Sequence, residues 1–87
     1  MAQILQVASV QILLFMLEKG EVRHSDLSGM MKSRGTLSLS LRDLQEEGLI
    51  NRKVLDTKPI QSLYTLSDKG TLVAQKLRDV RAIVNKL

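Results

Sequence analysis

The chain of 87 residues contains no cysteine and a single histidine, His24. Without cysteine it can form neither disulfides nor thiolate metal sites, and it cannot use a thiol in catalysis. One histidine does not complete a zinc site, and general acid–base catalysis would require a positioned partner for it. No glycine-rich phosphate loop follows a predicted strand. We therefore expect no enzymatic activity, no cofactor and no metal ion, and we interpret His24 as a strand or loop residue.

Signals for export and for membrane insertion are missing as well. Residues 1–17 are largely apolar, but they lack a basic start and a small-residue cleavage site. The segment is shorter than the about 20 apolar residues of a membrane span, and Gln3, Gln6 and Ser9 interrupt it. The chain has no internal repeat, low-complexity tract or interdomain linker. These absences predict one cytoplasmic domain over residues 1–87, without a membrane partner.

Charge and hydrophobic content are the features that are present. Lys and Arg number 13 against 9 Asp and Glu, so the formal net charge is +4, and hydrophobic residues make up 44%. This hydrophobic content argues against disorder. The positive charge is compatible with an anionic partner such as nucleic acid, although it would equally serve solubility alone.

Residues 36–47 show the clearest helical period in the chain. Leu37, Leu41 and Leu44 share one face at about 100° per residue, whereas Leu39 falls on the opposite face. That opposite face otherwise carries small hydroxyl side chains and one arginine. The pattern predicts a helix with one face in a core and the other face fitted closely to a surface.

A hairpin is predicted directly after this helix. Gly48 can take the left-handed position that ends the helix. Residues 50–55 and 60–66 are rich in β-forming side chains and flank a break that contains Pro59. Three basic residues surround the hairpin tip: Arg52, Lys53 and Lys58. A small-residue helix followed by a basic-tipped hairpin is typical of a winged helix-turn-helix.

The elements before this helix are assigned from periodicity and capping residues. Residues 3–19 predict a first helix that is apolar nearly all round. A short β-bridge is expected at residues 21–24. A short second helix is expected over residues 26–31, with Ser25 as its N-cap, and residues 32–35 form the turn into the next helix.

A last helix is predicted over residues 68–86, with Ser67 as its N-cap. It carries a narrow apolar seam, and the first helix has almost no polar face, so a core from 87 residues is too small to cover both. We therefore expect residues 1–20 and 68–87 to form a two-fold homodimer. The expected interface residues are Ile4, Leu5, Ala8, Ile12, Val73, Leu77, Val80, Val84 and Leu87.

The candidate DNA-binding site lies within residues 25–66, on the predicted helix 36–47 and the hairpin. The N-terminal residues of a recognition helix reach base edges in the major groove. Arginine pairs with guanine, Ser and Thr are versatile, and Leu39 is suited to a thymine methyl group. The expected DNA-binding residues are Ser33, Arg34, Gly35, Thr36, Ser38, Leu39, Arg42, Arg52, Lys53 and Lys58. Two other interpretations are a solvated helix face and a hairpin whose charges protect a sheet edge.

Two stretches of the chain resemble a known family. Residues 33–50 follow the pattern S-x-x-T-L-S-x-x-L-x-x-L-x-x-x-G-L-I, and residues 64–70 are close to Y-x-L-T-x-K-G. Both patterns are similar to those of winged-helix transcription regulators of the HxlR and MarR type, with the PadR and ArsR groups as close competitors. The resemblance implies a homodimer joined through the first and last helices, double-stranded DNA recognition, and a prokaryotic or archaeal source. Positions 39 and 40 depart from these relatives, which often carry Arg, Lys or Gln there.

The sequence therefore predicts a mainly α fold with a β-hairpin wing, in the order helix, short strand, helix, helix, strand, strand, helix. The expected function is sequence-specific binding of double-stranded DNA by a homodimeric transcriptional regulator. Residues 36–47 would enter the major groove, and residues 50–66 would lie on the backbone or in the minor groove. The alternatives are a winged helix used for protein–protein contact, with Leu39 in its surface, and an architectural DNA-binding protein with little sequence preference.

Overall fold

The computed structural model describes residues 7–31 and 33–86, and its elements follow the predicted order. They are α1 (Val7–Lys19), β1 (Val22–Arg23), α2 (His24–Ser28), α3 (Arg34–Glu46), β2 (Ile50–Leu55), β3 (Gln61–Leu66) and α4 (Asp68–Lys86). The mainly α fold with a β-hairpin is thus confirmed. The expected interface residues Ile4, Leu5 and Leu87 lie outside the described residues. Within the described ranges, no helix is both long enough and apolar enough to cross a membrane.

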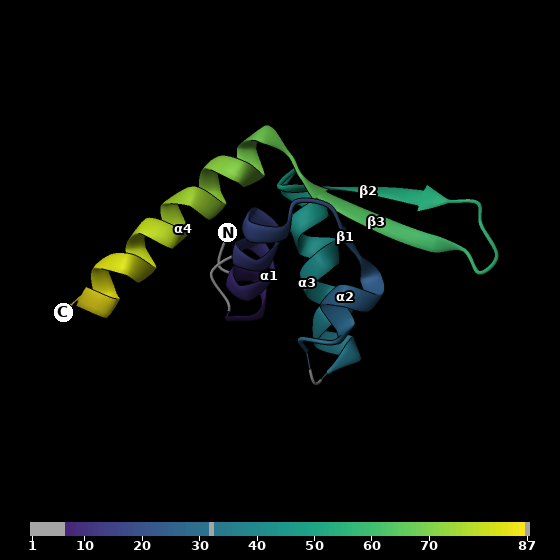
Figure 1. Cartoon of the computed structure of the whole chain (residues 1–87), viewed down its shortest axis with the longest axis horizontal. Coiled ribbons are helices and arrows are strands. Elements are labelled where there is room, and N and C mark those ends of the chain that lie inside the picture. Colours follow the sequence, from purple (N-terminus) through teal and green to yellow (C-terminus); the bar gives the residue numbers. More distant parts are fainter. Residues whose placement is uncertain (1–6, 32, 87) are drawn as a thin grey trace.

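The sheet is antiparallel and has the strand order β1-β3-β2. β1 is short and pairs with β3 only near the base of the hairpin, where Val22 lies opposite Tyr64. β2 pairs with β3 along its whole length, from Ile50 opposite Leu66 to Leu55 opposite Gln61. Only the base of β2 is buried, so the far end of the hairpin projects from the body as a wing (Figure 1).

α1 passes through the middle of the core. Its residues Ile12, Leu13 and Met16 are fully buried. They belong to one core cluster to which every other element contributes, with the members Val22, Leu27, Leu37, Leu41, Leu44, Leu49, Ile50, Tyr64 and Ala74. The expected placement of Ile12 in a dimer interface is therefore wrong. A helix in the middle of a small domain is covered from several sides, so the chain itself buries this part of α1.

α3 begins two residues before the predicted start at residue 36. Ser33 is its N-cap, because the Ser33 Oγ accepts the backbone N–H of Thr36 at 3.2 Å. Arg34 and Gly35 are thus the first residues of the helix and not part of the preceding turn. The predicted end is confirmed, since Gly48 has a left-handed φ of +74° just after the helix.

α2 also differs from its prediction. It begins at His24, so Ser25 lies inside the helix and is not its N-cap. The first turn is held by Asp26, whose carboxylate accepts the backbone N–H of Arg23 at 3.0 Å. The helix ends at Ser28 and contributes the buried side chain of Leu27 to the core.

α4 starts against the core and then leaves it. Ser67 is its N-cap, as predicted: the Ser67 Oγ accepts the N–H of Gly70 at 3.0 Å and donates to the carbonyl oxygen of Gly48 at 2.6 Å. These contacts fix the start of α4 to the C-terminal end of α3. Farther along, Val80 and Val84 are 56% and 63% exposed. In Figure 1 α4 extends away from the body on the side opposite the wing, so the molecule is elongated, with extents of 48 × 27 × 23 Å.

Candidate nucleic-acid interface

The outward face of α3 carries all the DNA-binding residues predicted on this helix. Leu37, Leu41 and Leu44 bury the inward face, which turns the opposite face to solvent. The exposed residues are Arg34, Gly35, Thr36, Ser38, Leu39 and Arg42. Leu39 is 53% exposed and is the large apolar side chain on this surface. The helix thus presents small side chains, two arginines and one leucine, and a ligand can approach its backbone closely.

A groove lies between α3 and the wing, and we call it the wing groove. Its lining residues are His24, Ser38, Leu41, Arg42, Gln45, Glu46, Arg52, Ser62 and Tyr64. Arg42 comes from α3 and Arg52 from β2, so the two arginines line one groove from different elements. The tertiary structure therefore joins the helix part and the hairpin part of the predicted site.

The guanidinium of Arg52 is oriented by the neighbouring strand. Its Nε and Nη2 atoms lie 3.3 and 3.1 Å from the Ser62 Oγ and donate to it. In the hairpin register Arg52 lies opposite Tyr64, whereas Lys53 lies opposite Leu63. Successive residues of a strand point to opposite faces. Arg52 therefore faces the wing groove, and Lys53 points to the other face of the wing.

The two remaining predicted residues lie at the edges of this site. Lys58 is exposed in the turn between β2 and β3, where the Thr57 Oγ1 donates to the Pro59 carbonyl oxygen at 2.7 Å. Ser33 is exposed at the N-terminus of α3, where it is the N-cap. The structure thus brings Ser38, Arg42 and Arg52 together around the wing groove. The other predicted residues lie outside this groove, namely Ser33, Arg34, Gly35, Thr36, Leu39, Lys53 and Lys58.

The wing groove has an acidic side chain at one end only. Glu46 lines the groove and is the last residue of α3. Its position adds negative charge near the C-terminus of the helix, where the helix dipole is also negative. An anionic ligand is therefore favoured toward the N-terminal half of α3, past Arg42. Among the described residues, no group of three or more His, Cys, Asp or Glu side chains is placed so that it could hold a metal ion.

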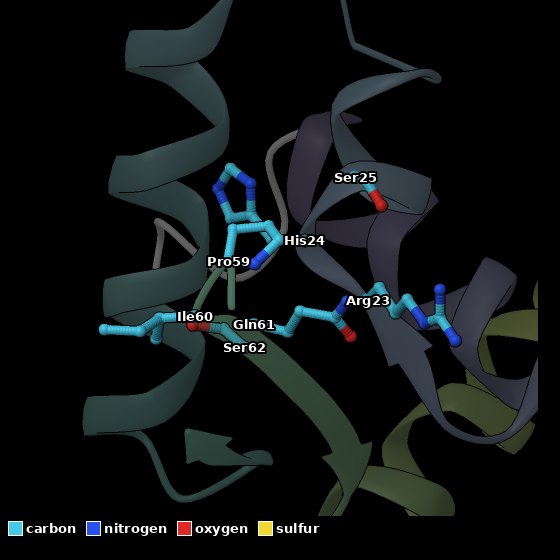
Figure 2. A pocket seen from close by; sticks show the side chains of 7 residues that line it. All are labelled: Arg23, His24, Ser25, Pro59, Ile60, Gln61 and Ser62. Atoms are coloured by element: carbon cyan, nitrogen blue, oxygen red, sulfur yellow. The ribbon is translucent and has the colours of Figure 1, made fainter. Parts of the chain in front are cut away.

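His24 belongs to the site although the sequence assigned it no role. It lines the wing groove and also a second hollow, formed by Arg23, His24, Ser25, Pro59, Ile60, Gln61 and Ser62 (Figure 2). This placement follows from the pairing of Val22 with Tyr64, which fixes the start of α2 beside the hairpin. Periodicity within a segment carries no information about pairing between distant segments, so no signal in the sequence pointed to it.

Apart from the buried Ile12, the described residues expected at the dimer interface lie at the surface of α1 and α4. Ala8, Val73 and Leu77 are half-buried, and the last two pack against the core. Val80 and Val84 lie in the outer part of α4 and are exposed. Exposed apolar side chains are therefore found in the outer part of α4, and Leu72 near its start is exposed as well.

Comparison with known proteins gives a consistent result. A family model described as HxlR-like helix-turn-helix matches residues 9–87. YvaP of Bacillus subtilis (strain 168), an uncharacterized HTH-type transcriptional regulator, is 32% identical over 73 residues, which are 82% of this chain and 68% of that protein.

Solved structures with the same fold are also found. The chain of ytfH from Salmonella typhimurium, which is assigned as a transcriptional regulator, has a TM-score of 0.83 and 28% identity, and the match covers 95% of this chain and 75% of that one. The reduced form of the transcriptional regulator YodB from B. subtilis has a TM-score of 0.77 at 22% identity, covering 99% of this chain and 85% of that one. The second likeness shows the fold alone.

Proposed function

Because the chain belongs to the HxlR-like helix-turn-helix family of transcriptional regulators, we propose that it acts as a homodimer that binds specific double-stranded DNA sequences. In this proposal α3 enters the major groove, and the wing lies over the adjacent backbone or minor groove. Such a regulator works where the chromosome lies, in the cytoplasm of a prokaryotic or archaeal cell.

The shared groove of Arg42 and Arg52 is the observation that carries this proposal. The major groove is about 12 Å wide and admits one helix, so an element beside that helix must meet the flanking phosphates. Arg52 is the wing residue placed beside α3, and Ser62 holds its guanidinium in position. The small residues Gly35 and Ser38 on the outward face let the helix backbone come close to base edges.

Exposed aliphatic side chains on α4 support the homodimer. Leu72, Val80, Ile83 and Val84 are 59%, 56%, 59% and 63% exposed. Fully burying such a side chain is worth roughly 1.5–3 kcal/mol, so covering four that are more than half exposed contributes on the order of 5 kcal/mol per subunit. A two-fold dimer through the exposed face of α4 would set two α3 helices for half-sites about one helical turn apart, roughly 34–36 Å.

The first experiment is a binding selection from random duplex DNA at two salt concentrations. A homodimer that reads bases should enrich a palindrome, and log affinity should fall linearly with log salt by about 0.9 per phosphate contact. No binding at low salt would favour the protein–protein module, and strong binding without an enriched sequence would favour the architectural protein.

Variants then separate reading of bases from contact with phosphates. Arg34→Ala should change the preferred sequence at one base position, at a cost of about 1–3 kcal/mol. Lys58→Ala should weaken all sequences about equally and lower the salt slope by about 0.9 for each subunit bound. Arg78→Ala is the matched control, because Arg78 lines a hollow formed by α1 and α4 residues and should leave both properties unchanged. A changed preference in Lys58→Ala but not in Arg34→Ala would contradict the proposed orientation.

A further inference from the structure

His24 occupies a central position in the proposed DNA site. It lines the wing groove together with Arg42 and Arg52, and it also lines the second hollow on the other side, next to Arg23. If α3 lies in the major groove of a duplex and the wing lies over the adjacent backbone, the phosphates of that backbone run along the groove between α3 and the wing. The imidazole therefore lies on the path of the flanking phosphates, a placement that rests on the proposed function.

The imidazole is presented to solvent and not buried. His24 is exposed and is the first residue of α2. Its ring centroid lies 6.3 Å from that of Tyr64, with an interplanar angle of 44°, and Tyr64 is only 4% exposed. The buried tyrosine thus gives the histidine a fixed neighbour, while the ring nitrogens stay available to a ligand. Figure 2 shows His24 and Pro59 among the residues that line the second hollow, with the Arg23 guanidinium pointing away from the imidazole.

The charged groups around His24 come from every element of the site. They are Arg23 of β1, Asp26 of α2, Arg42 and Glu46 of α3, and Arg52 of β2, and Tyr64 of β3 is the other titratable neighbour. The Asp26 carboxylate accepts the N–H of Arg23 within its own turn. Glu46 lies at the C-terminal end of α3. Arg23 points away from the imidazole (Figure 2), so the wing groove itself has two guanidinium groups and the imidazole against the one carboxylate of Glu46, and this balance favours an anionic ligand.

We infer that His24 is a further DNA-contacting residue, whose protonated imidazole donates a hydrogen bond to a backbone phosphate at the wing groove. An imidazolium has two N–H donors and one positive charge, whereas the neutral ring has one donor and no charge. Its hydrogen bond to a phosphate is charge-assisted. A phosphate contact therefore favours the protonated ring over the neutral one, and histidine is the side chain that most readily changes its charge near neutral pH. The DNA affinity therefore rises as the pH falls.

The test measures affinity for one fixed duplex at pH 5.5 and pH 8.0, each over a series of salt concentrations. For the wild-type protein, affinity at pH 5.5 should exceed that at pH 8.0 by on the order of tenfold for each subunit bound, the worth of one hydrogen bond to a charged group. The salt slope should be steeper at pH 5.5 by about 0.9 for each subunit bound, because one more phosphate is neutralised.

Two variants assign the effect to this side chain. His24→Gln keeps a hydrogen-bond donor without a titratable charge, so it should have the wild-type affinity of pH 8.0 at both pH values. His24→Arg carries a permanent charge, so it should keep the steeper slope at both. Circular dichroism at each pH confirms that the variants are folded.

The outcomes separate this inference from the proposed function. A wild-type protein that does not bind duplex DNA with salt dependence overturns the proposed function itself. A wild-type protein that binds DNA equally at both pH values overturns only the role of His24. That role is also overturned if His24→Gln retains the pH dependence, or if His24→Arg binds no better than His24→Gln at pH 8.0.

Discussion

Replacing Gly70 by alanine should destabilise the domain although it lies in a helix, where alanine is normally preferred. Gly70 is buried in the first turn of α4, directly against the backbone of Leu49. A Cβ atom built on Gly70 would overlap the Leu49 carbonyl oxygen and would lie 2.8 Å from its carbonyl carbon. Neither group is the flexible end of a side chain, so the start of α4 would have to move.

The size of the effect depends on the bonds that such a movement disturbs. The N–H of Ser67 donates to the Leu49 carbonyl oxygen at 3.0 Å, and the Ser67 Oγ donates to that of Gly48 at 2.6 Å. Each hydrogen bond contributes about 1 kcal/mol net, and overpacking a tight site costs about 1–3 kcal/mol. Alanine recovers about 1 kcal/mol of helix propensity. The free energy of unfolding should therefore fall by at least about 2 kcal/mol.

Gly35→Ala is the matched control, because Gly35 is also a glycine in the first turn of a helix. The nearest atom to its added Cβ is the Ser33 Oγ at 3.8 Å, an ordinary contact. This variant should be at least as stable as the wild type, with a gain of up to about 1 kcal/mol.

Urea denaturation followed by circular dichroism measures both variants, at one protein concentration because dimerisation couples to stability. In a thermal scan the Gly70→Ala variant should melt roughly 10 °C lower, at about 4–8 °C per kcal/mol for a domain of this size. Wild-type stability in Gly70→Ala would refute the expected clash with Leu49. An equal loss of stability in Gly35→Ala would refute it too, since the loss would then be a general property of first turns.

Three further predictions concern DNA and assembly. Gly35→Ala should lower DNA affinity by about tenfold while keeping the fold, because its methyl group faces the proposed base edges; unchanged affinity in a fluorescence titration would place DNA elsewhere. Replacing single thymines of the selected site by deoxyuridine should weaken binding at one position, by about 1 kcal/mol for the lost methyl, and Leu39→Ala should abolish that sensitivity; a sensitivity retained in the variant would exclude Leu39 as the reader. Val80→Glu combined with Val84→Glu should make the protein monomeric in light scattering, because unpaired charge in an interface costs several kcal/mol, and DNA affinity should fall with it; a folded dimer of this variant would place the interface elsewhere.

Several features of this protein could be read from local sequence because local interactions determine them. The outward position of Leu39 follows from the helical period of its neighbours, and the sequence anticipated it. The left-handed φ of Gly48 and the bond from the Gly70 N–H to the Ser67 Oγ are local features, so both helix boundaries were predicted correctly. The boundary at Ser33 was missed, because Arg34 and Gly35 are weaker helix signals than the leucine period that follows them.

Tertiary structure decided what depends on contacts between distant segments. α1 is apolar nearly all round, so its sequence has no period that tells an inward face from an outward one. Only packing against the other elements shows that Ile12 is covered by the chain itself. Arg52 and Lys53 are both basic, and it is the sheet register and the position of α3 that turn Arg52 alone toward the wing groove. His24 enters the site for the same reason, since the pairing of β1 with β3 brings together residues that no local pattern connects.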